Sequence, residues 1–171
     1  MNKILFISFL LFSIGLSKGI QKKVNKEIKN TFETEAFTLS EVMIDSELAN
    51  SLASDFNNNN LYKIESKNEV LGYAYISKAF GKLDYFDYLV LLDKDLIVLK
   101  SKILVYREDY GGEIGSKRWL KQLIGKSKDD KLVYGDNIMA ISGATVSVQA
   151  MTNAMNDLFY SLKILHSKNT F

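Results

Sequence analysis

The sequence contains no cysteine, no proline and only one histidine. The absence of cysteine excludes a disulfide scaffold, an iron–sulfur cluster and a cysteine-based zinc site. With His166 alone, a histidine metal site or a histidine-based catalytic triad is not expected. The carboxylates Asp84, Asp87, Asp93 and Asp95 lack the spacing of a calcium-binding loop. We therefore expect no metal site and no catalytic residues, and no reaction catalysed by this chain alone.

The chain also has little net charge, since 22 basic and 20 acidic residues give +2. Lys3 and Lys18 lie in an expected leader, and without them the two counts are equal. Because nucleic-acid-binding proteins derive most of their affinity from a basic face, we expect no nucleic-acid partner. The 171 residues, of which 47% are hydrophobic, suffice for one domain with a substantial core.

Residues 1–19 predict a secretory signal peptide. Lys3 supplies the positive start, an apolar stretch covers 4–16, and the small residues Ser17 and Gly19 follow. The apolar stretch is shorter than the roughly 20 residues that span a bilayer, which favours a cleaved signal over a retained anchor. The protein is therefore expected to be exported, to the periplasm or to the outer face of the cytoplasmic membrane.

Residues 20–60 predict an N-terminal helical or surface segment. The lysine-rich part, 20–35, is expected to be the first helix or a surface segment. Ser40 is a candidate N-cap for a short second helix. The asparagine run 57–60 predicts a loop. The buried stripe of that second helix is expected to comprise Val42, Leu48 and Leu52.

The region after residue 60 predicts an antiparallel sheet. Tyrosine, valine, isoleucine and leucine are enriched in four runs, 61–65, 70–79, 85–92 and 96–107. The connections at 67–68 and 93–95 are too short for crossovers, so hairpins are expected.

Two helices are expected after the strands. Residues 118–124 predict a short helix that Gly125 ends. The last helix is long, because five apolar residues fall on one stripe. These are Met151, Met155, Leu158, Leu162 and Leu165. The expected fold class is α+β: one domain over 61–166, with helices packed on a twisted antiparallel sheet, and a tail over 167–171.

A candidate ligand site lies where the long helix begins. An apolar run, Ile138–Ile141, is expected to be a short strand that leads into the helix. The free N–H groups and positive dipole end of a helix start suit a phosphate, and Gly143 would let the backbone approach closely. Ser142, Thr145 and Ser147 offer hydroxyl groups there. Such residues also cap helices without any ligand, so both interpretations stay open on the residues alone.

The tetrapeptide Ser142-Gly143-Ala144-Thr145 resembles the flavinylation motif of the FMN-binding domain family. That family includes the subunits that carry covalent FMN in the sodium-pumping NADH:quinone oxidoreductase and in the Rnf electron-transport complex. The resemblance implies that Thr145 carries FMN through a phosphoester bond. It also implies that a magnesium-dependent flavin transferase installs the FMN from FAD. Ser147 is a second acceptor candidate, or a hydrogen-bond donor to the phosphate.

A second segment, 105–114, resembles the glutamate-and-glycine segment that precedes the motif in small members of the family. The resemblance implies that Glu108, Tyr110, Gly111 and Gly112 lie near the flavin ring. Both segments occur here in the family's order, behind an export signal, which makes the resemblance more specific than four common residues alone.

Two other positions bear on this hypothesis. Members of the family usually carry an aspartate six positions before the modified threonine, where this chain has Met139; Asp136 lies three residues earlier. If the transferase reads that carboxylate, modification of Thr145 is expected to be slow or absent. Trp119 lies between the two segments, where it either packs in the core or stacks on the flavin.

The resemblance predicts an exported electron-transfer flavoprotein with covalently attached FMN. Its expected partners are the flavin transferase and a redox partner protein, which could be membrane-bound. The alternative is a flavin-free accessory or binding module of the same fold.

Overall fold

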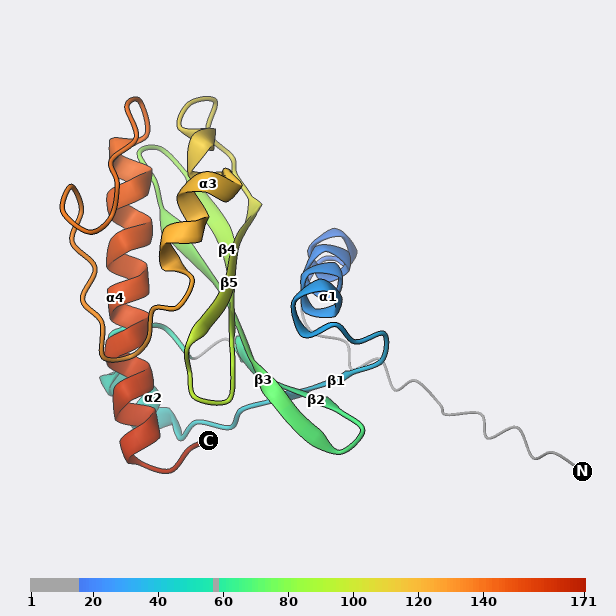
Figure 1. Cartoon of the computed structure of the whole chain (residues 1–171). Helices are drawn as coiled ribbons and strands as arrows, with labels where there is room; N and C mark the ends of the chain where they lie inside the picture. The colour runs from blue at the N-terminus through green and yellow to red at the C-terminus, as the bar shows by residue number, and fades with distance from the viewer. Residues whose placement is uncertain (1–15, 57–58) are drawn as a thin grey trace, which may run out of the picture.

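The computed structural model describes residues 16–56 and 59–171, which form an antiparallel sheet flanked by helices (Figure 1). The five strands are adjacent in sequence order, β1-β2-β3-β4-β5, and every pair is antiparallel. The strands are β1 (Thr38–Glu41), β2 (Leu61–Ser66), β3 (Glu69–Phe80), β4 (Tyr85–Leu92) and β5 (Val98–Val105). The α-helices are α1 (Lys18–Phe32), α2 (Ser46–Ser51), α3 (Lys117–Leu120) and α4 (Thr145–Ser167), with 3₁₀ turns η1 (Gly112–Gly115) and η2 (Lys121–Leu123) beside α3. The α+β expectation is confirmed.

The sheet connections follow from local chemistry. Lys67 and Asn68 both adopt positive φ, 51° and 65°, as the favoured two-residue hairpin turn requires. In the β4–β5 turn, Asp93 Oδ1 accepts hydrogen bonds from the N–H groups of Asp95 and Ile97, each at 2.9 Å. The short helical segment after β5 ends at Leu123, two residues before Gly125, whose φ is +81°. Hairpins rather than crossovers therefore build the sheet, as predicted.

The sheet is covered on both faces, and this explains why β4 is almost continuously apolar. One face packs against α4, whose five expected stripe residues are all fully buried. The other face packs against α1, of which Val24 and Ile28 are fully buried. Figure 1 shows the sheet between these two helices. The lysine-rich segment is therefore a helix, one of the two structures expected for it.

The expected second helix is shorter than predicted: α2 covers Ser46–Ser51, so Val42 and Leu52 lie outside it, and its buried residue is Ala49. Two other local predictions are wrong. Ser40 does not cap a helix, because it lies in β1 opposite Lys63 of β2; Asp45 caps α2 instead. The four-residue strand β1 forms because β2 offers it an open edge, which no local pattern reveals. The run Ile138–Ile141 is not a strand either, since only an isolated bridge from Ile138 to Tyr134 forms there.

The expected signal peptide lies largely outside the described residues, and its expected boundary after Gly19 falls within α1. Ser17 caps this helix, its hydroxyl accepting from the N–H of Ile20. Within 16–56 and 59–171, no helix combines the length and the apolar character needed to cross a membrane.

Candidate functional site

The start of α4 is an uncapped helix N-terminus. Thr145 is its first residue and Ala144 its N-cap, and no side chain accepts a hydrogen bond from the first turn. Neither Ser142 nor Thr145 therefore serves as the cap. The helical geometry leaves the N–H groups of Thr145, Val146 and Ser147 without intrahelical partners. No acidic residue lies in this first turn, so the positive end of the helix dipole is open to an anion.

The hydroxyl-bearing residues at this turn differ in accessibility. Thr145 and Ser142 are not buried, whereas Ser147 is only 3% exposed. Gly143 adopts φ of +82°, and a Cβ built on it would meet no atom within 4 Å. Glycine is thus favoured here for its backbone conformation rather than for the close approach that the sequence suggested. A reagent from solution reaches Thr145 but not Ser147.

The structure brings the glycine segment directly against this turn. A Cβ on Gly111 would lie 3.4 Å from Ala144 Cα and 2.7 Å from the Tyr106 hydroxyl oxygen. Gly111 also has φ of +87°, a conformation in which glycine is favoured. The two segments that carried the family resemblance, separated by some 30 residues of chain, are therefore in contact at Gly111 and Ala144.

Tyr106 stabilises this contact, although the sequence predicted only a packing role in a strand for Tyr106. Its hydroxyl donates to the carbonyl oxygen of Tyr110 at 2.8 Å and lies 2.9 Å from Ser147 Oγ. Because the single phenolic proton is used on Tyr110, the Ser147 hydroxyl must donate its proton to Tyr106. Ser147 therefore has no proton left for a phosphate, which disfavours both roles suggested for it.

Glu108 is engaged elsewhere. Its carboxylate accepts from the N–H groups of Leu83 and Asp84, at 2.9 and 3.2 Å, in the β3–β4 turn. Partial burial raises the pKa of Glu108. The hydrogen bonds that the backbone N–H groups of Leu83, Asp84 and Lys82 donate have a larger, opposite effect, so the pKa is lowered overall. Gly112 is far less constrained than Gly111, because an added Cβ would meet only a Tyr106 ring carbon, at 4.0 Å. Within the glycine segment, Gly111 therefore lies against Ala144, whereas the Glu108 carboxylate does not.

The loop before the site is held by side chains rather than by a strand partner. The Trp119 indole N–H donates to the carbonyl of Met139 at 2.8 Å, and Gln122 Oε1 accepts from the Met139 N–H at 2.6 Å. Trp119 is only 3% exposed, so packing, and not stacking on a ligand, describes it. The Met139 side chain is 56% exposed and Asp136 is exposed. Neither residue has a role in the fold that would require its side chain.

Apolar side chains surround the open helix start. Tyr110, next to Gly111, is 84% exposed, and Val146, next to Thr145, is 43% exposed. Exposed apolar side chains beside uncapped N–H groups suit a ligand with an aromatic part and a phosphate. Among the residues described, no three His, Asp or Glu side chains are grouped to hold a metal ion.

Comparison with protein families agrees with this geometry. The family model of the FMN-binding domain matches residues 81–159. The match lies within the domain expected at 61–166 and contains both contacting segments. It also includes most of α4. No curated protein matches the chain.

Proposed function

Since the chain belongs, through residues 81–159, to the FMN-binding domain family, we propose that it carries FMN covalently on Thr145. FMN is the cofactor that the family match supports, and the chain is a flavin-binding protein. The proposal adds the phosphoester bond, export to the periplasm or to the outer face of the cytoplasmic membrane, and electron transfer to a redox partner.

The observation that carries the proposal is an accessible hydroxyl at an uncapped helix start. Thr145 is accessible, while Ser147 is buried and its proton is committed to Tyr106. The N–H groups of Val146 and Ser147 are free to receive phosphate oxygens at the positive end of the dipole. The residues therefore fit a phosphate held at Thr145, with the ring lying over nearby apolar side chains such as Tyr110.

The attachment reaction requires a transferase and FAD. The Thr145 oxygen bonds to the phosphorus of the FMN half of FAD, and the pyrophosphate bond breaks. AMP leaves with the bonding electron pair, and the hydroxyl proton is released to the transferase or to solvent. The chain gains one FMN less one water, and no redox change accompanies this step.

The bound flavin would supply the redox chemistry, while this chain supplies its position. Among the described hydrogen bonds, none joins the Thr145 hydroxyl to a base; the exposed hydroxyl of Ser40 does donate to the Glu65 carboxylate, at 3.3 Å, but this pair lies on β1 and β2. We therefore propose a carrier, with the donor and acceptor of electrons on partner proteins. Covalent attachment suits an exported carrier, because free FMN would be lost by diffusion.

The test is co-expression of the chain with a competent flavin transferase, followed by intact mass and in-gel flavin fluorescence. We expect a mass increase of one FMN less one water on the peptide that contains Thr145. Thr145→Ala should abolish the increase, Thr145→Ser should retain some of it, and Ser147→Ala should leave it in place. An unmodified wild-type mass, with the transferase active on another acceptor, would refute covalent attachment.

Met139 provides a sharper version of this test. If the transferase reads a carboxylate six positions before the acceptor, Met139→Asp should increase the modified fraction at a fixed reaction time. Because the Met139 side chain is exposed, this substitution should not disturb folding. A chain that stays unmodified in both forms but binds added FMN reversibly would be a non-covalent flavoprotein. A chain that binds no FMN would be the flavin-free module.

A further inference from the structure

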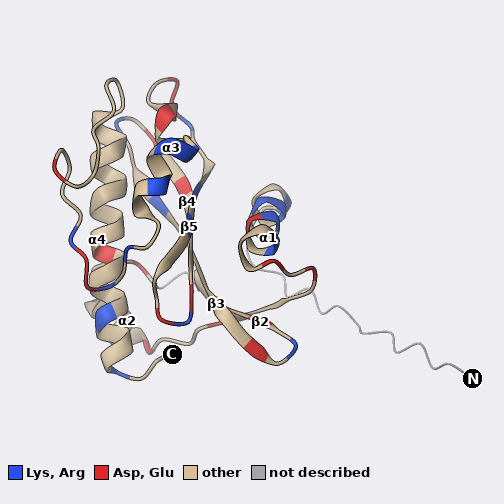
Figure 2. Cartoon of the chain, in the orientation of Figure 1, with Lys and Arg blue, Asp and Glu red and all other residues tan. Residues whose placement is uncertain are grey.

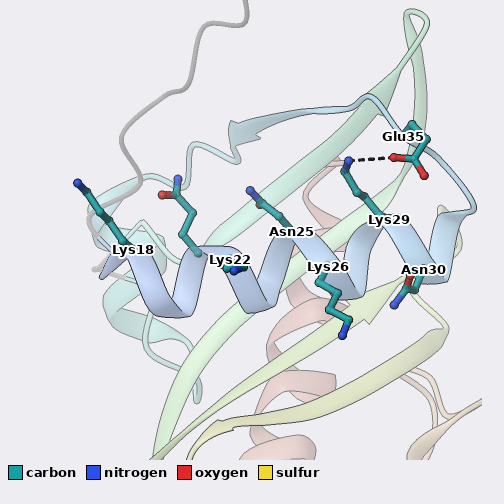
Figure 3. A pocket seen from close by; sticks show the side chains of 8 residues that line it. Lys18, Lys22, Asn25, Lys26, Lys29, Asn30 and Glu35 are labelled. Atoms are coloured by element: carbon teal, nitrogen blue, oxygen red, sulfur yellow. Dashed lines mark hydrogen bonds and ion pairs between the residues drawn. The ribbon is translucent and has the colours of Figure 1, made fainter.

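The outward face of α1 carries a stripe of lysines. Lys18, Lys22, Lys26 and Lys29 follow one another at spacings of four, four and three residues, which places them on one side of a helix. Val24 and Ile28, which are fully buried against the sheet, lie on the opposite side. Figure 3 shows the lysines with Asn25 along a shallow groove on the exposed side of the helix.

The stripe is almost free of acidic neighbours. Glu27, the single acid of α1, is turned toward β5, with a side chain 16% exposed and 4.0 Å from Lys100. At the far end of the groove, Lys29 pairs with Glu35 at 3.0 Å, and the C-cap residue Glu33 is exposed. Lys18, Lys22 and Lys26 are exposed.

Charge is segregated between this helix and the rest of the chain. Five lysines and one glutamate give α1 a charge of +4, whereas residues 33–171, with 16 basic and 19 acidic residues, carry −3. In Figure 2, the ribbon of α1 is coloured for several basic residues, while most of α4 is uncharged. A stripe of one sign on a protein of the opposite net sign is a local attractor for anions.

We propose that α1 lies on a bilayer surface that contains anionic phospholipids, with the lysine stripe against the headgroups. Two features favour a bilayer over an acidic protein. Before any cleavage, the apolar sequence 4–16 directly precedes the stripe in the chain, and basic residues that adjoin an apolar segment are attracted to anionic lipid. The stripe is also linear and free of exposed apolar anchors, which a protein interface would need at its centre.

This inference goes beyond flavin attachment and does not depend on it. The helix α1 and the helix α4 cover opposite faces of the sheet (Figure 1). A bilayer under α1 would therefore leave the α4 side, with Thr145 at its start, facing water. If the chain is cut after Gly19, Lys22, Lys26 and Lys29 remain.

The test is vesicle co-sedimentation of the full chain. Vesicles of phosphatidylcholine alone are compared with vesicles that also contain phosphatidylglycerol, at low salt and at about 1 M salt, where charges are screened within about 3 Å. We expect the phosphatidylglycerol vesicles to bind the chain at least about tenfold better at low salt. Each exposed lysine contributes roughly fivefold at an anionic surface. The variant K22Q/K26Q/K29Q, which removes two exposed lysines and the paired Lys29, should therefore reduce the preference by at least about tenfold, toward equal binding to the two kinds of vesicle.

Charge-matched variants make the result specific. Lys94, Lys117 and Lys121 are exposed and lie away from α1, so K94Q/K117Q/K121Q should leave the preference unchanged. Because Lys29 pairs with Glu35, K29Q alone should have a smaller effect than K22Q or K26Q. Thr145→Ala should bind the vesicles like wild type, so a failed flavin proposal would not affect this result.

Three outcomes would overturn the inference. The first is equal binding to the two kinds of vesicle at low salt, which would mean that only the apolar segment anchors the chain. The second is an equal loss of vesicle preference in the two triple variants, which would mean that net charge alone determines binding. The third is binding to polyglutamate without a preference for anionic vesicles, which would mean that the stripe binds an acidic protein.

Discussion

The helices α1 and α4 cover opposite faces of one sheet but are built in different ways. In α4, 10 of the 23 residues are buried, and the first turn has neither a cap nor an acid. In α1, 2 of the 15 residues are buried, Ser17 caps the start, and five lysines are present. The family match covers most of α4 and none of α1.

The difference suggests that the two faces of the sheet serve different ligands. The helix α4 is part of the main core, and its start is left open where a phosphate would bind. The helix α1 contributes little to the core and presents its charge outward. A flavin site could therefore be kept rigid on one face while the other face adapts to its surroundings.

The largest expected effect tests whether α4 contributes more than α1 to the stability of the fold. Leu158 of α4 and Ile28 of α1 are both fully buried. Leu158→Ala should lower the free energy of unfolding by about 3 kcal/mol, because it leaves a cavity in the main core. Ile28→Ala should cost less, since α1 can separate locally while the sheet stays folded. Equal losses in the free energy of unfolding, measured by urea-induced unfolding, would show that the two helices contribute equally to stability.

A smaller effect is expected where the glycine segment meets α4. Gly111→Ala should lower the free energy of unfolding by about 1–2 kcal/mol, because its φ is positive and the new Cβ meets the Tyr106 hydroxyl. Gly112→Ala is the matched control, with open space around its Cβ. Thermal unfolding of both variants measures the difference, and a Gly112→Ala loss as large as that of Gly111→Ala would contradict the proposed packing.

The smallest expected effect concerns Glu108 and pH. Its pKa is lowered in the folded chain, so the carboxylate stabilises the fold above its unfolded pKa of about 4.3. This stabilisation is lost as the pH falls through the lower, folded pKa. Glu108→Gln should therefore unfold at a lower temperature than wild type at about pH 7, with the gap closing below about pH 4. Glu113→Gln serves as a control, and a gap that stays constant with pH would argue against the carboxylate's role in the turn.

The elements that sequence patterns predicted well are those fixed by local or periodic chemistry. The α4 stripe and the four long strands follow from apolar spacing, and the turns follow from residues such as Asn68 and Asp93. Strand β1 was missed because it exists only as a partner of β2. The run at Ile138–Ile141 was misassigned because the side chains of Trp119 and Gln122, distant in sequence, take the backbone hydrogen bonds of Met139.

For the site, the sequence indicated the segments but not how they meet. The contact between Gly111 and Ala144 supports the pairing of the two segments that carried the resemblance. Tyr106 could not be recognised from sequence, because its function depends on Ser147, 41 residues away. The position of Glu108 in the β3–β4 turn likewise depends on tertiary structure.

The hydrogen bonds from Ser147 to Tyr106 and from Tyr106 to the Tyr110 carbonyl are complete without any ligand. The receiving turn is therefore assembled when the chain folds, and attachment needs no later rearrangement of these groups. An unfolded or partly folded chain would lack the turn and would be a poor substrate for a transferase. If Thr145 carries covalent FMN, as we propose, the modification would then distinguish correctly folded molecules from those that failed to fold.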